Sequence, residues 1–281
     1  EARELEDGMQ DIKIAGRIVF MRKMGKLSFI KIRDIESAIQ VSLQLDLLGD
    51  KYAFFKTSFD VGDFIGAEGE IVTTQTGEKT LRAHNIEFLG KALKPLPEKF
   101  HGVTDQEIKY RSRYVDLIMN EDARERFLLR SKLIWEIRNF LNKEGYIEIE
   151  TPILNNKASG ALAKPFITHH NALDADFYLR IAPETYLKRA IIGGFTKVYE
   201  FARCFRNEGM DATHLQEFTQ VEWYAGYWDF EKNITFFKNL VKELLIKALG
   251  TTTVNYQGKE IIAIGTHYPF DDAFSDLQNK L

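Results

Sequence analysis

Alternating apolar and polar positions run through the first third of the chain, which is the pattern of short strands that bury one face. We predict strands at Ile12–Met21, Lys26–Arg33, Ala38–Leu45, Asp63–Thr74 and Lys79–Leu89, and a short helix around Lys51–Ser58. Five strands with a helix between the third and the fourth are typical of the OB-fold, a small β-barrel. We therefore predict that residues 1–94 form a five-stranded OB-fold barrel.

The outward face of this barrel is predicted to expose an aromatic ring among cations. In Lys26–Arg33 the alternation turns Ile30 and Ile32 inward and Phe29 outward. The next strand turns three polar residues outward beside that ring, namely Gln40, Ser42 and Gln44. A ring can stack on a base, an amide can hydrogen-bond a base edge, and cations can contact phosphates. We predict an RNA-binding surface that consists of Arg22, Phe29, Lys31, Arg33 and Gln40. The simpler alternative is a single surface phenylalanine on a charged barrel.

The chain beyond the barrel begins with Pro95 and Pro97, which mark residues 95–118 as a linker. An amphipathic helix should follow from Asn120 to Gly145, with an apolar stripe of Phe127, Leu133, Ile134, Ile137 and Leu141. Further predicted elements are strands at Tyr146–Thr151 and Tyr178–Ile181, a helix that Pro183 opens, a helix over Phe230–Leu249, and strands around Gln257 and Gly258. Glu184 would lie in the first turn of the Pro183 helix, and the small residues around Gly160 would let the backbone approach a ligand.

The segment from Lys197 to Asp229 holds most of the candidate chemistry and reads as two strands joined by a polar loop, Asn207–Gln216. The two-residue period puts Val198, Glu200, Ala202, Cys204 and Arg206 on one face of the first strand, and Phe218, Gln220, Glu222 and Tyr224 on one face of the second. An antiparallel hairpin would unite both rows on one surface. An arginine fork suits phosphate or carboxylate oxygens. The alternative is a solvated hairpin whose charges face water.

Composition limits the function classes. The net charge is −3, 44% of the residues are hydrophobic, and Cys204 is the single cysteine. The sequence therefore predicts a soluble, cytoplasmic two-domain protein without an internal disulfide or a cysteine cluster for zinc. No apolar run approaches the roughly 20 residues of a membrane-spanning helix. The first residue is Glu1, and we expect the chain to be a piece of a longer protein.

One string of residues resembles the second signature motif of class II aminoacyl-tRNA synthetases. It consists of Phe-Arg-Asn-Glu-Gly at 205–209, His214, Glu217-Phe218-Thr219 and Glu222. With the stretches at 99–102, 164–174, 178–184 and 193–195, nearly the whole chain is similar to class II lysyl-tRNA synthetases of the bacterial type. The resemblance implies an α+β architecture, in which the barrel binds the anticodon. Residues 119–281 would then be an antiparallel-sheet catalytic domain, truncated before the third motif.

The resemblance also implies site residues. Arg206 would hold the α-phosphate and the lysine carboxylate, Glu208 and His214 would lie near ATP, and Phe218 would stack on adenine. Gly160 and Glu184 would take the α-amino group of lysine, while Glu222 and Tyr224 would bind its side-chain ammonium. In the barrel, Phe29 and Gln40 match positions that read the central anticodon base. The implied partners are tRNA, L-lysine, ATP with Mg²⁺ and, for the full-length enzyme, a second copy.

Two departures from the family pattern leave alternatives open. Leu215-Gln216 follows His214 where these enzymes usually have Asn-Pro, and the third motif is absent. An aspartate- or asparagine-specific relative and a non-catalytic tRNA-binding fragment are therefore the other hypotheses, although acids at 184 and 222 favour lysine. The implied Mg²⁺ carboxylates would lie beyond Leu281, so no metal ligand is assigned. We expect the chain as given to activate lysine slowly and to dimerise poorly.

Overall fold

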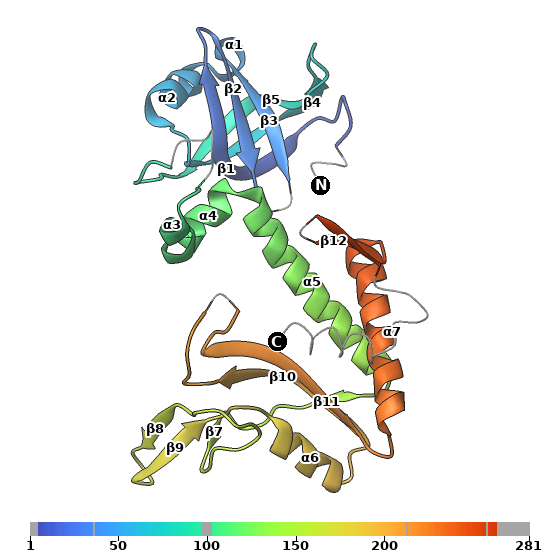
Figure 1. Ribbon diagram of the computed structural model, residues 1–281. Helices are drawn as coiled ribbons and strands as arrows, with labels where there is room; N and C mark the ends of the chain where they lie inside the picture. The colour runs from blue at the N-terminus through green and yellow to red at the C-terminus, as the bar shows by residue number, and fades with distance from the viewer. Residues whose placement is uncertain (1–4, 36, 97–102, 212, 257, 263–281) are drawn as a thin grey trace. The chain divides into compact units, whose positions relative to one another are not determined.

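The computed structural model describes residues 5–35, 37–96, 103–211, 213–256 and 258–262 (Figure 1). The chain divides into two compact units, Glu1–Arg126 and Phe127–Leu281, and each is described here by itself. None of the helices in the described ranges is both long and apolar enough to cross a bilayer.

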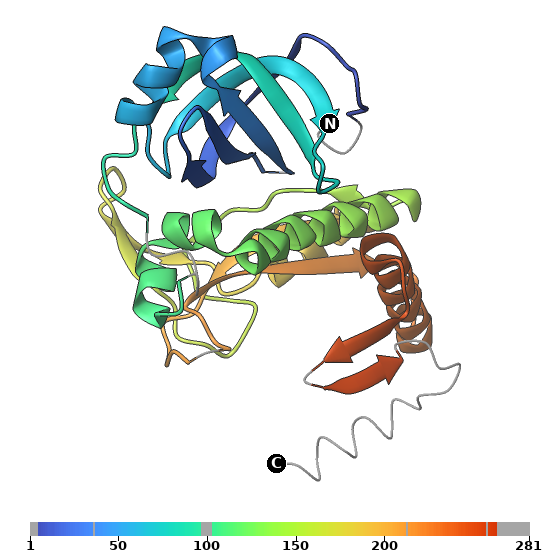
Figure 2. The ribbon, with the colours of Figure 1, turned by 90° about the horizontal axis from the view of Figure 1, so that it is seen from above.

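The first unit contains the predicted barrel. Its strands are β1 (Ile12–Lys23), β2 (Leu27–Arg33), β3 (Ala38–Gln44), β4 (Phe64–Thr73) and β5 (Lys79–Gly90). They close in the order β1-β2-β3-β5-β4, with β3 and β5 parallel and the other pairs antiparallel. Two helices, α1 (Leu45–Leu48) and α2 (Asp50–Ser58), connect β3 to β4 and lie together against the barrel (Figure 2). The prediction of five strands with a helix in this position is confirmed.

The barrel is filled by the inward residues of its strands and by one face of α2. Ile30, Val41 and Leu43 are fully buried, as the strand alternation predicted, and Phe55 of α2 packs against the same cluster. Where β4 and β5 shift register, the chain requires a glycine. A Cβ on Gly69 would lie 2.1 Å from the carbonyl oxygen of Arg82, so any side chain there would force the two strands apart.

The segment predicted as a linker contains two short helices, α3 (Gln106–Arg111) and α4 (Arg113–Met119). Asp105 caps α3 by accepting a hydrogen bond from the backbone amide of Ile108. The carboxylate of Asp116 is buried and accepts bonds from Arg113 at 2.8 Å and from Asn120 at 2.6 Å. Proline signals alone did not reveal these helices, because neither has an apolar stripe long enough to stand out.

The second unit is built on a three-stranded sheet with the order β11-β10-β6. Its strands are β6 (Ile147–Glu148), β10 (Lys197–Phe205) and β11 (Glu217–Ala225), and the long helices are α5 (Glu121–Lys143), which begins in the first unit, and α7 (Phe230–Leu249). β10 and β11 are antiparallel, whereas β6 runs parallel to β10. The predicted helix over Phe230–Leu249 is confirmed. The predicted strand at Tyr146–Thr151 is wrong in length, because only two of its residues pair with β10.

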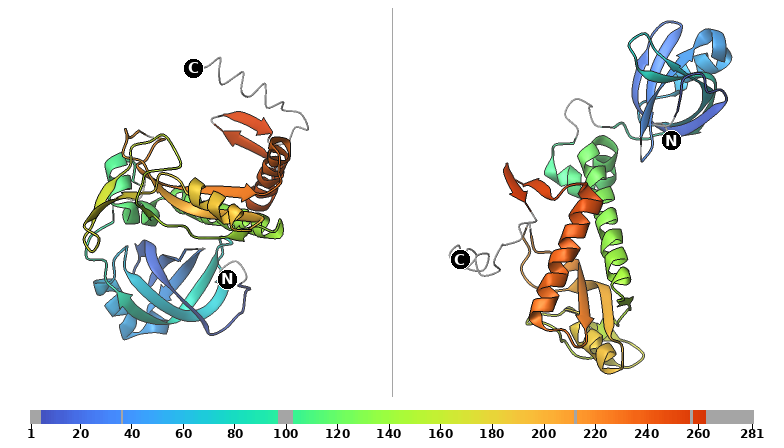
Figure 3. Two further views of the ribbon diagram at one scale, coloured as in Figure 1. Left: turned by 90° about the horizontal axis from the view of Figure 1, so that it is seen from below. Right: turned by 90° about the vertical axis from the view of Figure 1, so that its right-hand side faces the viewer.

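Helices α5 and α7 run side by side and antiparallel (Figure 3, right). Lys132, in the middle of α5, donates to the carbonyl of Ala248 near the end of α7, and Lys143, the last residue of α5, pairs with Glu243 of α7. Residues from both helices, from the sheet and from the turn between α5 and β6 form a single, mostly aromatic core of Phe140, Leu141, Tyr146, Tyr199, Phe236 and Leu240. This core covers one face of the β10–β11 hairpin and leaves the opposite face for a site.

A small sheet and one helix complete the second unit. The sheet has the order β7-β9-β8, with β7 (Leu154–Asn155), β8 (Ile167–His170) and β9 (Ala175–Leu179), and the helix is α6 (Glu184–Ile192). The predicted strand at Tyr178–Ile181 starts earlier and ends at Leu179. Pro183 directly precedes α6, which begins one residue later than predicted, and Pro183 makes no side-chain cap bond. Strands β12 (Thr253–Tyr256) and β13 (Lys259–Ile262) form the late hairpin. Gln257 and the segment around Tyr268 lie outside the described residues.

Candidate functional site

The β10–β11 hairpin presents one row of predicted site residues on a single face. Its register pairs Val198 with Tyr224, Glu200 with Glu222, Ala202 with Gln220, and Cys204 with Phe218. The other face carries Tyr199, Phe201, Val221 and Trp223 and packs on the aromatic core. The assignment of the two faces from the sequence is therefore confirmed, and the face with Glu222 is the one turned away from α5 and α7.

Arg206 and Phe218 meet at the end of this face where the hairpin loop begins. The guanidinium carbon of Arg206 lies 5.0 Å from the centroid of the Phe218 ring. The Nε atom of Arg206 is buried and has no hydrogen-bond partner among the described residues. A buried donor without a partner costs about 1–3 kcal/mol, so this nitrogen is suited to an anionic ligand. The backbone amide of Arg206 donates to Gln216 at 2.8 Å, which ties the two ends of the loop.

Glu222 is the half-buried acid in the middle of the face. Its carboxylate accepts hydrogen bonds from the side-chain amide of Gln220 at 2.6 Å and from the hydroxyl of Tyr224 at 3.2 Å. Burial raises the pKa of Glu222, and the like charges of Glu184 and Glu200 raise it further. Burial also raises the pKa of Tyr224. The carboxylate is therefore held where a cationic group would stabilise its charge.

Helix α6 contributes a second acid and a lysine to the same surroundings. Lys188 donates to Glu184 at 2.5 Å, one helical turn away, and its Nζ lies 5.9 Å from the centroid of the Tyr224 ring. The backbone of Gly160 has a φ of +96°, and a Cβ there would lie 3.0 Å from Cβ of Ala182. The Gly160 backbone is thus packed closely against Ala182, just before the start of α6, and its predicted approach to a ligand stays a prediction.

The loop residues Glu208 and His214 are less closely tied to this cluster. Glu208 is exposed and accepts a bond from the backbone amide of Lys164 at 3.2 Å. The His214 side chain is 74% exposed, and its Nδ1 lies 2.8 Å from a carboxylate oxygen of Asp211. Hydrogen bonds from the amide and hydroxyl of Thr213 and from His214 lower the pKa of Asp211. Among the hydrogen bonds and ion pairs of the described residues, none joins Glu208 or His214 to the side chain of Arg206 or Phe218.

Sequence reasoning missed the ion pair beneath this face. Arg180, directly after β9, donates from Nη1 to Glu200 at 2.5 Å, and only about one-twentieth of either side chain is exposed. Thr151 donates to the second oxygen of Glu200 at 2.6 Å. The available signal was a lone arginine between apolar residues, in Tyr-Leu-Arg-Ile-Ala. Such a charge needs a buried partner.

On the barrel, the strand register brings four of the five predicted RNA-binding residues together. Arg22 of β1 pairs with Phe29 of β2. Lys31, two residues further along β2, pairs with Gln40 of β3. Gln40 donates to the hydroxyl of Thr80 at 2.9 Å. Arg33 pairs with Arg17 and Ala38 at the far end of β2, where burial lowers its pKa. The cluster is therefore Arg22, Phe29, Lys31 and Gln40, with Arg33 at its edge.

Two details of this surface differ from the prediction. Phe29 is half-buried instead of exposed, and Ser42 is buried although it was expected to face outward. Ser42 lies between Phe29 of β2 and Arg82 of β5 in the strand register. Larger side chains on both neighbouring strands shield a small serine, which alternation alone cannot reveal.

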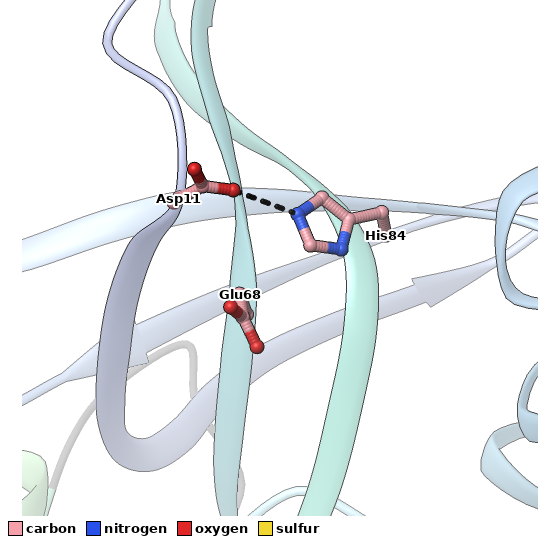
Figure 4. A group of neighbouring side chains, drawn as sticks. All are labelled: Asp11, Glu68 and His84. Atoms are coloured by element: carbon pink, nitrogen blue, oxygen red, sulfur yellow. Dashed lines mark ion pairs between the residues drawn. The ribbon is translucent and has the colours of Figure 1, made fainter.

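One group of potential metal ligands occurs in the described residues, on the barrel instead of the hairpin. Asp11, Glu68 and His84 place one ligand atom each within 4.8 Å of the others (Figure 4). The Nε2 of His84 is 4.0 Å from a carboxylate oxygen of Asp11. Glu68 already pairs with Lys13 at 3.3 Å, and the Asp11 side chain is 86% exposed. This group is an ordinary surface cluster.

Comparison with known proteins agrees with both halves of the chain. A family model described as tRNA synthetases class II (D, K and N) matches residues 105–279, and one for an OB-fold nucleic acid binding domain matches residues 12–89. The lysine–tRNA ligase of Chromobacterium violaceum is 47% identical over 262 residues, which is 93% of this chain and 52% of that protein. The lysine–tRNA ligases of Legionella pneumophila (strain Lens) and Aquifex aeolicus are each 49% identical, over 93% and 91% of this chain and 52% and 43% of their own lengths.

The chain thus spans about half the length of the curated relatives that it matches. Because the synthetase model matches more than half of its residues, the chain belongs to the family of class II tRNA synthetases specific for D, K and N.

Proposed function

We propose that the protein ligates L-lysine to its tRNA through a lysyl-adenylate. The observation that carries this proposal is the unmatched charge of Glu222. Of the three carboxylates around the site, Glu200 pairs with Arg180 and Glu184 pairs with Lys188. Within the described residues, Glu222 has no basic nitrogen within ion-pair distance and is hydrogen-bonded by neutral groups. A half-buried carboxylate in this state fits the side-chain ammonium of lysine, since a desolvated ammonium requires an acid.

The neighbouring residues suit the rest of the amino acid. Tyr224 lies beside Glu222 and would contact the same ammonium. Glu184 at the start of α6 would bind the α-amino group of lysine. The backbone of Gly160, which packs closely on Ala182, would lie beside the same group. Arg206 would then hold the carboxylate, at the other end of the hairpin face.

Arg206 and Phe218 suit a nucleotide. The unpartnered Nε of Arg206 would bind an α-phosphate oxygen, and the Phe218 ring would stack on adenine. Glu208 and His214, on the adjacent loop, would approach the nucleotide when it binds. In the reaction, a lysine carboxylate oxygen forms a bond to the α-phosphorus while the bond to the bridging oxygen breaks and pyrophosphate leaves. Arg206 would stabilise the charge that develops on the α-phosphate oxygens.

The family implies Mg²⁺ with ATP, and Mg²⁺ would neutralise phosphate charge. In the described part of the second unit, no group of three His, Cys, Asp or Glu side chains is close enough to hold a metal ion. Because Mg²⁺ that binds with ATP is usually held by one or two carboxylates together with the phosphates, no residue of this chain is assigned to the metal and no step is routed through it.

The barrel would bind the anticodon of the tRNA. Phe29 would stack on a base, Gln40 would hydrogen-bond its edge, and Arg22, Lys31 and Arg33 would contact phosphates. We keep residues 1–94, 95–118 and 119–281 as the proposed anticodon-binding domain, linker and catalytic domain. A cytoplasmic location and a homodimer of the full-length enzyme belong to the same proposal.

The other two hypotheses make different predictions. An aspartate-specific relative would place a carboxylate beside Glu184 and Glu222, which like charge disfavours. An asparagine-specific relative would place a neutral amide there, which leaves the charge of Glu222 without a cation. A non-catalytic fragment would bind tRNA without activating any amino acid. ATP–pyrophosphate exchange with each amino acid, on this chain and on a version of the relatives' length, separates the three. Exchange that depends on lysine alone supports the proposal. Exchange with aspartate or asparagine, or none in either version, would contradict it.

A further inference from the structure

Arg180 and Glu200 form the ion pair whose two side chains are most buried among the described residues, at 5% and 4% exposed. Apolar residues of similar volume usually stabilise a core at least as well as a buried ion pair. Stability alone is therefore a weak reason for these charges. Their position suggests another reason, because Glu200 lies directly opposite Glu222 on the adjacent strand.

Two carboxylates in one half-buried site raise each other's proton affinity. The groups that face Glu222 are Tyr224 from its own strand, Glu200 and Cys204 from β10, and Glu184 and Lys188 from α6. The pKa of Cys204 is raised to about 11 by burial, so the thiol is neutral. Glu184 is matched by Lys188, which leaves Arg180 as the cation that offsets Glu200.

Arg180 also fixes the end of β10. Its Nε donates to the carbonyl of Arg203 at 2.7 Å, and its own carbonyl accepts from the amide of Phe205 at 2.9 Å. These bonds flank Cys204 and end one residue before Arg206. A second bond from Nη1 reaches the carbonyl of Thr151 at 3.0 Å. One buried guanidinium thus orders the strand that carries Glu200 and ends directly before Arg206.

We propose that Arg180 and Glu200 are positioning residues of the amino-acid site, a neutral buried pair that leaves Glu222 as the charged group available to an ammonium substrate. This inference rests on the proposed function and adds a specificity role for residues that do not touch the substrate. It predicts that the charge at position 200, more than the packing there, controls the protonation of Glu222.

The test uses two variants of the 281-residue chain, E200Q and R180M/E200Q, with wild type as reference. The titration midpoint of Glu222 is followed by carbon NMR on protein with ¹³C-labelled glutamate, and E222Q identifies the signal. E200Q keeps the shape but leaves Arg180 as an unmatched cation, so the midpoint should move to lower pH. R180M/E200Q removes both charges, and the midpoint should return toward that of wild type. Urea unfolding checks that each variant is folded.

Opposite results would overturn the inference. If the pair served only packing, the Glu222 midpoint of R180M/E200Q would differ from wild type at least as much as that of E200Q, and it would not recover. An unchanged or higher midpoint in E200Q therefore rejects the charge role. The test does not require R180M alone. That variant would leave the buried Glu200 without its cation and is the one most prone to unfold.

Calorimetry with L-lysine and L-norleucine at pH 7 separates this inference from the proposed function. E200Q should weaken lysine binding about tenfold, an ordinary coupling between neighbouring groups, and R180M/E200Q should recover most of it. Norleucine has no ammonium on its side chain and should respond to neither change. If wild type does not prefer lysine over norleucine, the proposed function fails. If it does, but E200Q changes neither lysine affinity nor the Glu222 midpoint, this inference alone fails.

Discussion

The guanidinium of Arg206 lies over the ring of Phe218, with Cζ 5.0 Å from the ring centroid. The two residues are twelve positions apart, and the antiparallel register of β10 and β11 brings them together. A cation over an aromatic face contributes about 0.5–1 kcal/mol at an exposed site. This contact is too weak to explain a buried Nε without a partner, so a ligand is the better explanation for the arrangement.

Arg206→Ala should lower lysine-dependent ATP–pyrophosphate exchange by about 10²–10³-fold, the usual effect of removing one donor to a transition-state oxyanion. The fold should survive, because Arg206 makes a weak ring contact and little else through its side chain. Exchange is measured in a version of the relatives' length. Arg203→Ala is the matched control, since Arg203 lies in the same hairpin with a side chain 52% exposed and pairs with Glu217. Near-normal exchange in Arg206→Ala would remove this residue from the site.

Phe29→Ala should weaken tRNA binding by about 1–3 kcal/mol, the value of one stacked base. Lysine activation should be unaffected, since Phe29 lies in the barrel. Phe54→Ala is the control, because Phe54 is a 50% exposed ring of the same domain on α2. Filter binding with the cognate tRNA compares the two variants. Equal losses would mean that Phe29 matters only through the stability of the barrel.

Phe236→Ala should lower the free energy of unfolding by about 3–5 kcal/mol, as for other buried aromatic residues. Phe236 is 6% exposed and its ring meets those of Phe140, Tyr146, Trp223 and Trp228. The adjacent Phe237 is 52% exposed and its ring stacks on Trp223, so Phe237→Ala should cost much less. Urea unfolding of both variants measures the difference. Similar losses would show that α7 does not bury the face seen here.

The sequence predicted the placement of most candidate site residues because they lie on regular structure. Strand alternation placed Glu222 and Phe218 on the face with Glu200, and the antiparallel pairing confirmed it. The barrel strands were equally predictable, since each buries a row such as Ile30 and Ile32. Local periodicity is enough wherever one face is buried and the other is not.

Long-range pairing and crowding were not predictable in this way. The Arg180–Glu200 bond joins residues twenty positions apart, one directly after β9 and the other within β10, and no period in the sequence links them. Ser42 is buried by its neighbours on adjacent strands, which alternation assigns to the outward face. Helices α3 and α4 are too short to leave a clear apolar stripe. Each of these features depends on contacts between residues that are distant in the sequence, and not on a local sequence pattern.

Gly160→Ala tests whether backbone near the start of α6 shapes the lysine site. Gly160 has a φ of +96°, and an alanine Cβ there would lie 3.0 Å from Cβ of Ala182 and 3.3 Å from its carbonyl oxygen. Gly194 has a φ of +107° with nothing within 4 Å of its ideal Cβ. Both substitutions should cost about 1–2 kcal/mol of stability, because L-residues disfavour positive φ. Gly160→Ala alone must also displace the loop from Ala182, two residues before Glu184, so it should weaken lysine binding by about tenfold as well. Calorimetry with L-lysine, paired with urea unfolding, measures both effects. If Gly194→Ala weakens lysine binding as much as Gly160→Ala, the close approach at Gly160 has no role in the site.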